Sequence, residues 1–96
     1  IPYHGLCQET KKGQHLYAVR IHLRGNFLVG RYADETEAAI AYNKAIDICL
    51  KKGVRRQFIP NYIEGLSPNR YAEIYTRISI SDKFLNYLDT TFPSNQ

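Results

Sequence analysis

The sequence predicts an α+β fold in which a three-stranded antiparallel sheet packs on one long α-helix, with two short C-terminal helices. Apolar and polar residues alternate over residues 16–24, which is typical of a strand with one buried face. The turn residues Arg24, Gly25 and Asn26 predict a hairpin into a further strand. Small apolar residues then recur at helical spacing after Asp34. Because three strands are not stable with both faces in water, we expect this helix to cover one face.

The expected sheet begins with a short strand over residues 3–8, in which Gly5 permits a bulge or a close backbone approach. Residues 9–14 are polar and are expected to form a loop that turns at Gly13. The next strand is expected to point Tyr17, Val19, Ile21 and Leu23 inward and Ala18, Arg20, His22 and Arg24 outward. Phe27, Val29 and Tyr32 continue the pattern into the third strand.

The long helix is predicted over residues 35–52. Asp34 is a good N-cap with Glu37 three residues later, and Gly53 ends the helix. The expected buried stripe consists of Ala38, Ala41, Tyr42, Ala45 and Cys49. Ile40 and Ile48 lie outside this stripe, so we expect the C-terminal segment to cover them.

Two short helices are predicted in the C-terminal segment. Ser67 caps the first, with Pro68 at its first helical position, and Ser81 caps the second, over residues 82–88. Their apolar residues are Tyr71, Ile74 and Tyr75 in the first and Phe84, Leu85 and Leu88 in the second. Residues 90–96 are expected to be frayed. We expect residues 1–60 to form the sheet-plus-helix unit and residues 61–96 to pack on the same core; the alternative is a dimer contact or the start of a neighbouring domain.

A length of 96 residues limits the chain to one domain with one modest core. No apolar run approaches the ~18 residues of a membrane span, so no membrane partner is expected. The chain begins with Ile1 rather than Met, which we interpret as a piece of a longer protein.

The net charge of +4 is unevenly placed. Residues 1–59 carry ten Lys and Arg against five Asp and Glu, whereas residues 60–96 carry three against four. A basic first portion favours a polyanionic partner for that portion alone. A surplus of lysines that only maintains solubility would give the same count.

Two cysteines are too few for a disulfide framework, which favours reduced thiols and an intracellular protein, nuclear if eukaryotic and cytoplasmic if bacterial or from a phage. His4, Cys7, His15 and His22 lack the spacing of a metal site. The chain also lacks a nucleophile–base pair and a glycine-rich phosphate loop. We therefore expect no catalysis, cofactor or small-molecule substrate here; any catalytic activity would lie elsewhere in a parent protein.

The outward residues of the expected sheet are suited to nucleic acid. Strand positions two apart lie about 6.5 Å apart, close to the phosphate spacing of a nucleic-acid strand. Arginine forms paired hydrogen bonds with guanine or phosphate, and asparagine suits adenine. The candidate row consists of Arg20, His22, Arg24, Asn26 and Leu28, with Lys11 and Lys12 on flanking phosphates and Arg31, Arg55 and Arg56 as further phosphate contacts. Alternating cations also occur on sheet faces that only contact water.

Five segments in order resemble the APETALA/ethylene-response-factor type of DNA-binding domain. They are YHGL at residues 3–6, YAVRI at 17–21, LVGRY at 28–32, EAAIAYNKA at 37–45 and FIP at 58–60. The family has YRGV, AEI, WLGTF, EEAARAYDRAA and LNFP in these places. Similar domains occur in phage and bacterial HNH endonucleases and integrases. The resemblance covers residues 3–60, and its most specific part is the helix segment.

The resemblance implies a sheet that lies in the DNA major groove and touches bases and phosphates through its outward residues. The positions that match the family's contact positions are His4, Cys7, Glu9, Lys11, Arg20, His22, Asn26 and Leu28. Several family arginines and both tryptophans are replaced here, so the family's GC-rich target is not implied. Glu9 would repel phosphate, or accept a hydrogen bond from a cytosine amino group.

We therefore predict sequence-specific binding of double-stranded DNA, as a transcription-factor domain or as the targeting module of a nuclease or integrase. Arg20, His22 and Arg24 form the expected centre of the interface. A sheet that binds RNA or single strands would need outward aromatic residues, whereas Tyr17 and Phe27 are expected to point inward. A protein-interaction module that keeps the fold would instead use Leu28 and the tyrosine-rich C-terminal segment.

Overall fold

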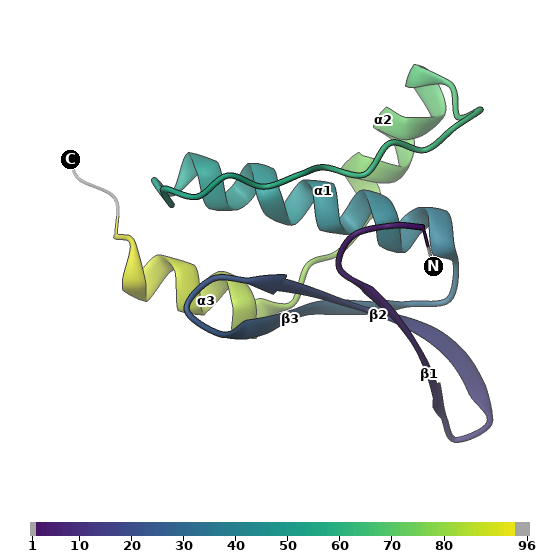
Figure 1. Ribbon diagram of the computed structural model, residues 1–96, viewed down its shortest axis with the longest axis horizontal. Helices are drawn as coiled ribbons and strands as arrows, with labels where there is room; N and C mark the ends of the chain where they lie inside the picture. Colours follow the sequence, from purple (N-terminus) through teal and green to yellow (C-terminus); the bar gives the residue numbers. More distant parts are fainter. Residues whose placement is uncertain (1, 94–96) are drawn as a thin grey trace.

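The computed structural model describes residues 2–93 and confirms the predicted α+β arrangement. Its elements are β1 (Leu6–Lys11), β2 (Gln14–His22), β3 (Asn26–Tyr32), α1 (Glu35–Lys51), α2 (Pro68–Arg77) and α3 (Asp82–Thr91). The three strands form one antiparallel sheet in the order β1-β2-β3. One side of the sheet packs on α1, while α2 lies against α1 and α3 lies beside the β2–β3 hairpin (Figure 1). Among the described residues, no helix is long and apolar enough to cross a bilayer.

The β1–β2 hairpin differs from the sequence prediction. The prediction of a strand over residues 3–8 and a polar loop over residues 9–14 is wrong, because β1 begins at Leu6 and continues to Lys11. The turn consists only of Lys12 and Gly13, which both have positive φ, as a two-residue hairpin turn requires. The hairpin end extends beyond α1 (Figure 1). Both faces of the hairpin end are therefore in water. Its residues are polar on both sides, so no alternation of apolar and polar residues marks the strands there.

Gly5 is the place of close approach that the sequence predicts. Its φ is 82°, and a Cβ at this position would overlap the ring of Tyr42 on α1. The Gly5 carbonyl accepts a hydrogen bond of 2.8 Å from the Arg20 N–H of β2. Glycine thus allows the chain before β1 to fit closely against both the Tyr42 ring and the backbone of β2.

A β-bulge in β3 was not signalled by the sequence. Val19 faces Gly30 and Arg20 faces Leu28, so Val29 is the extra residue. Val29 and Val19 are both fully buried. The bulge therefore keeps both valines in the core while Arg20 stays on the opposite side of the sheet.

The turn between β2 and β3 also differs from the prediction. β2 ends at His22, and a hydrogen bond of 2.8 Å from the Leu23 N–H to the Gly25 carbonyl closes the turn. Arg24 therefore lies in the turn, as its place among the predicted turn residues implies, and not in the outward row of a strand. Asn26 is the first residue of β3, as its place in the candidate row implies, and not part of the turn.

α1 agrees with the prediction to within one residue. The Asp34 side chain accepts from the Glu37 N–H at 2.9 Å, and Lys52 is the C-cap. Ala38, Ala41, Ala45 and Cys49 are fully buried. Burial raises the pKa of the Cys49 thiol to about 11 and that of the Tyr32 hydroxyl to about 12.

The C-terminal helices complete the same core. Ile74, Ile78, Phe84 and Leu88 are buried in one cluster with Ile40 of α1 and Val29 of β3. α3 continues to Thr91, so the expected fraying at residues 90–91 is wrong. The Phe92 N–H caps α3 by donating to the Leu88 carbonyl, and Phe92 itself packs against the core. The rest of that expectation, residues 94–96, lies outside the described residues.

Two buried asparagines connect parts of the chain that are far apart in sequence. The Asn43 side chain donates to the Asn61 carbonyl at 2.8 Å and accepts from the Asn61 N–H at 2.7 Å. The Asn61 side chain accepts from the His4 N–H and donates to the carbonyls of His4 and Ala39. Asn43 and Asn61 are 6% and 7% exposed. The pair therefore fixes the extended segment after α1 both to α1 and to the chain before β1.

Replacement of Asn43 by alanine is expected to destabilise the domain strongly. The change leaves the backbone N–H and carbonyl of Asn61 without partners inside the protein, which costs about 2–4 kcal/mol. Urea unfolding measures this loss, and Asn86→Ala on the exposed side of α3 is the control, expected to change stability by less than about 0.5 kcal/mol. Equal stabilities of the two variants would contradict this role of the asparagine pair.

Candidate nucleic-acid interface

The side of the sheet turned away from α1 is here called the outer face. Cross-strand pairing places Cys7, Glu9, Lys11, Gln14, Leu16, Ala18, Arg20, His22, Asn26, Leu28 and Arg31 on it. The aromatic strand residues Tyr17, Phe27 and Tyr32 belong to the other side, where they contact the core. Within the described strands, the outer face is therefore polar and basic and carries no Tyr or Phe.

Glu9 joins two arginines at the centre of the outer face. Its carboxylate accepts from Arg31 Nε at 2.8 Å and from Arg20 Nη2 at 3.4 Å. These three residues come from three different strands. The hydrogen bond from Arg31 is the largest cause of the lowered pKa of Glu9, and it outweighs desolvation, which raises the pKa. The charge of Arg31 and the weaker contact with Arg20 lower the pKa further. The carboxylate is thus charged at neutral pH and holds both guanidinium groups.

Ala18 lies beneath this group of side chains. It pairs with Cys7 on one side and Arg31 on the other, so it belongs to the outer face as the sequence predicts. It is nevertheless 0% exposed. A small residue here leaves room for the longer charged side chains around it to lie across the sheet.

His22 and Asn26 form the next pair along the outer face. Their side chains are hydrogen-bonded, with 3.1 Å between His22 Nδ1 and Asn26 Oδ1, and both residues are exposed. His4 precedes β1 and is not a strand residue; its side chain lines a hollow of about 220 Å³ together with those of His22 and Arg56. The structure therefore brings His4 and His22 to one hollow, at the end of the sheet where β2 and β3 extend beyond the start of β1.

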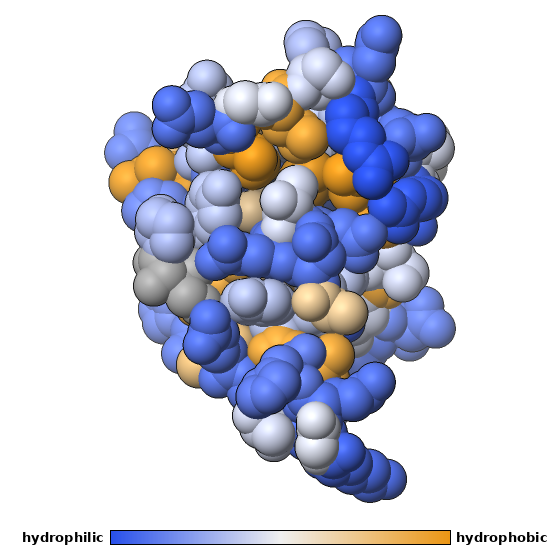
Figure 2. Space-filling model, turned by 90° about the vertical axis from the view of Figure 1, so that its right-hand side faces the viewer, coloured by the Kyte–Doolittle hydropathy of each residue, from blue (hydrophilic) through white to orange (hydrophobic). Residues whose placement is uncertain are grey.

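The remaining predicted cations lie at opposite ends of the sheet. Lys11 and Lys12 are exposed at the β1–β2 turn, and Arg24 is exposed at the β2–β3 turn. β2 separates the two ends by roughly 30 Å at ~3.3 Å per residue. None of the three makes an ion pair with another described residue. Figure 2 shows that the lowest part of the molecule, where the β1–β2 hairpin ends, is strongly hydrophilic.

Cys7 and Leu28 differ in their surroundings. Cys7 is exposed with a free thiol. Leu28 is half-buried and lines an apolar groove of about 430 Å³ with Phe27, Phe84 and Tyr87, between the edge of β3 and α3. Sequence reasoning did not find this groove, because α3 is more than fifty residues away from β3 along the chain.

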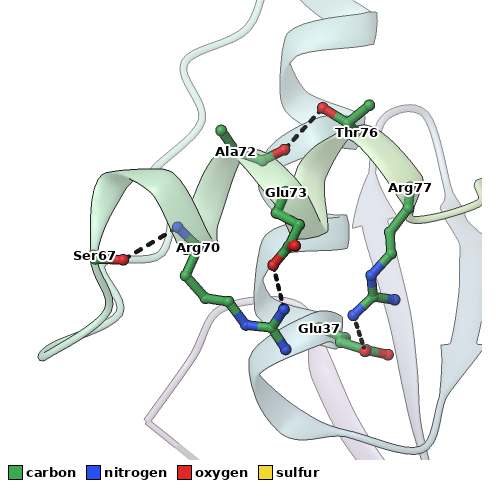
Figure 3. Close-up of polar contacts among 7 residues, drawn as sticks. All are labelled: Glu37, Ser67, Arg70, Ala72, Glu73, Thr76 and Arg77. Carbon is green, nitrogen blue, oxygen red and sulfur yellow. Dashed lines mark hydrogen bonds and ion pairs between the residues drawn. The ribbon is translucent and has the colours of Figure 1, made fainter.

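The arginines of α2 are not part of the outer face. Arg70 pairs with Glu73 of the same helix, and Arg77 pairs with Glu37 of α1 at 2.8 Å (Figure 3). Both pairs lie on the side of α1 where α2 packs, so these arginines serve as controls for the basic residues of the sheet.

Within residues 2–93, no three His, Cys, Asp or Glu side chains are grouped so that they could hold a metal ion. His4 and His22 share a hollow without a third such ligand, while the side chain of His15 contacts Thr10 near the β1–β2 turn.

The pKa of the Glu9 carboxyl can be used to test its contacts with Arg20 and Arg31. Replacing Arg31 by glutamine is expected to raise the pKa of Glu9 back toward 4.5, and to do so by more than Arg20→Gln, because Arg31 forms the shorter and stronger hydrogen bond. NMR titration of the Glu9 side-chain carboxyl between pH 2 and 7 measures both shifts. A larger effect of Arg20→Gln, or no effect of either, would contradict the geometry.

Comparison with protein-family models, with curated proteins and with solved structures found no match for this chain.

Proposed function

We propose that this domain binds double-stranded DNA in a sequence-dependent way, with the outer face of the sheet in the major groove. The observation that carries the proposal is the distribution of charge on that face. Two arginines are held by Glu9 at the centre, whereas Lys11, Lys12 and Arg24 are unpaired among the described residues at its ends. The resemblance to the APETALA/ethylene-response-factor type of domain supports the same mode of binding, as part of a transcription factor or as the targeting module of a nuclease or integrase.

The dimensions of the sheet suit a major groove. Strands lie ~4.8 Å apart, so three strands form a backbone layer about 10 Å wide, against a groove width of about 12 Å. The distance of roughly 30 Å between the two turns is close to the ~34 Å of one helical turn of DNA. Both ends of the sheet can therefore approach phosphates while its centre faces base edges.

Arg20 and Arg31 are the residues best placed to contact bases. Each guanidinium has five N–H donors, and the hydrogen bond to Glu9 uses only one of them. A guanidinium that is already fixed loses less conformational freedom when it binds, which favours a defined contact with guanine. The His22–Asn26 pair extends this polar centre along the strands, and the lysines of the β1–β2 turn suit phosphates.

A protein-interaction module is the second candidate function, and the groove of Phe27, Leu28, Phe84 and Tyr87 favours it. An apolar groove binds a partner mainly through buried apolar surface, which depends little on salt. DNA binding depends strongly on salt, because each phosphate contact releases counterions. The two functions therefore predict different slopes in a plot of log affinity against log salt concentration.

DNA binding is tested first with the intact chain and a site selected from a random duplex pool. Five phosphate contacts predict a slope of about −4.5 in a plot of log affinity against log salt. On that site, Arg20→Ala is expected to cost about 1–3 kcal/mol and to relax the sequence preference. Fluorescence anisotropy between 50 and 300 mM salt measures both quantities.

Arg70→Ala is the matched control for Arg20→Ala, because both residues are arginines in one surface ion pair with a glutamate. It is expected to leave affinity and preference nearly unchanged. Equal losses in the two variants would exclude the outer face as the binding surface. A flat salt dependence, or no duplex binding at 50 mM salt, would favour the interaction module.

The reactivity of the two cysteines tests whether DNA covers the outer face of the sheet. Cys7 is exposed on the outer face and is expected to react with N-ethylmaleimide, and a saturating duplex is expected to slow this reaction at least tenfold. Cys49 is fully buried, and burial raises its pKa to about 11, so it is expected to remain unmodified with or without DNA. Mass spectrometry of both peptides measures the result; equal labelling of Cys7 in the free and bound states would place the DNA elsewhere.

A further inference from the structure

Three arginines meet at the β2–β3 turn around a hollow that the outer face does not include. Arg24 comes from the turn itself, and Arg55 and Arg56 come from the extended segment after α1. Leu23, Val54, Tyr87 and Phe92 complete the lining of this hollow of about 200 Å³. Although Arg24 is some thirty residues away from the other two in sequence, all three are exposed and share one site.

The hollow is held together by contacts that leave two of its arginines free. Arg56 Nη2 donates to the Leu23 carbonyl at 3.1 Å, which fastens the extended segment to the turn. The Tyr87 ring is stacked on Phe27 with 4.1 Å between the ring centres, so the apolar wall is fixed as well. Arg24 and Arg55 have no ion-pair partner among the described residues. Asp89, which comes between the lining residues Tyr87 and Phe92 in the sequence, is paired with Lys52 at 2.6 Å.

The positive charges of arginines around a hollow with apolar walls attract anions strongly. Apolar walls have a low dielectric constant, so the field of the arginines is concentrated in the hollow. Guanidinium groups bind phosphate oxygens through paired hydrogen bonds. A volume of about 200 Å³ is several times the ~30 Å³ that a water occupies, so a phosphate group can enter.

We propose that the hollow of Arg24, Arg55 and Arg56 is a clamp for a phosphate of the DNA backbone at the end of the binding site. It lies directly beyond the His22–Asn26 pair, at the end of the sheet opposite Lys11 and Lys12. The clamp extends the proposed function and rests on it. It fixes the position of the sheet along the groove and adds affinity without reading bases.

The test removes the two free arginines and keeps Arg56, which fastens the turn. The double variant Arg24→Gln/Arg55→Gln is compared with Arg70→Gln/Arg77→Gln, which removes the same net charge from α2. Loss of the contact with the one clamped phosphate makes the salt slope shallower by about 0.9. When salt is raised from 50 to 200 mM, the loss of affinity in the clamp variant is then expected to be about 3.5-fold smaller than in the unmodified chain, whereas the α2 variant behaves like the unmodified chain.

Duplexes with single methylphosphonate linkages locate the contact. Neutralising one phosphate near one end of the site is expected to weaken the unmodified chain several-fold and to leave the clamp variant unchanged. The preference for the selected site over a scrambled duplex is expected to be the same in both proteins. Circular dichroism and thermal melting confirm that the variants are folded.

The outcomes separate the clamp from the proposed function. Duplex binding with the expected slope in the unmodified chain, but with the same slope in the clamp variant, overturns the clamp and leaves DNA binding intact. An equal decrease of the slope in the α2 variant also overturns it, because total charge then explains the loss. No duplex binding by the unmodified chain overturns both proposals.

Discussion

The hydrogen bonds between Asn43 and Asn61 constrain parts of the molecule that apolar packing alone does not fix. The segment after α1 is extended, is largely exposed and forms no regular secondary structure before α2. Its path is set where Asn61 bonds to Asn43 of α1 and to the backbone of His4. That path carries Arg55 and Arg56 to the β2–β3 turn. The extended segment therefore has two fixed points, the hydrogen bond from Arg56 to the Leu23 carbonyl at the β2–β3 turn and the buried amide pair. The amide pair must keep all its partners, because an unpaired buried amide is costly.

Local patterns in the sequence were sufficient for most of the fold. Alternating apolar residues predicted β2 and β3, and the caps at Asp34, Ser67 and Ser81 placed the helix starts correctly. The β1–β2 hairpin was misplaced because both of its faces are in water at its end, so no burial pattern reports its strands. The bulge at Val29 was missed because it depends on pairing with β2, which single-strand periodicity does not contain.

The sequence predicted which side of the sheet carries the candidate site, but not the contacts among the side chains of that site. The sequence correctly placed Arg20 and His22 on the outer side of the sheet, since alternation along a strand determines the side to which a residue points. Arg31 was predicted only as a further phosphate contact, and it lies on the outer side because of the bulge at Val29. It could not pair Glu9 with Arg31, which is twenty-two residues further along the chain. Nor could it bring Arg24 and Arg55 together, because their proximity depends on where the chain runs after α1. In both cases the missing information is a long-range contact.

Glu9 gives the centre of the outer face a different electrostatic character from its ends. At the centre one carboxylate offsets one of two arginine charges, so Arg20 and Arg31 attract a polyanion less than two free cations would. What they gain is a fixed orientation, and orientation is what discrimination between bases requires. The unpaired cations at the β1–β2 and β2–β3 turns have the opposite properties: they are exposed, and they suit phosphates whatever the sequence. Under the proposed function, removal of a central arginine therefore changes which site is bound, whereas removal of a terminal one changes how tightly any site is bound.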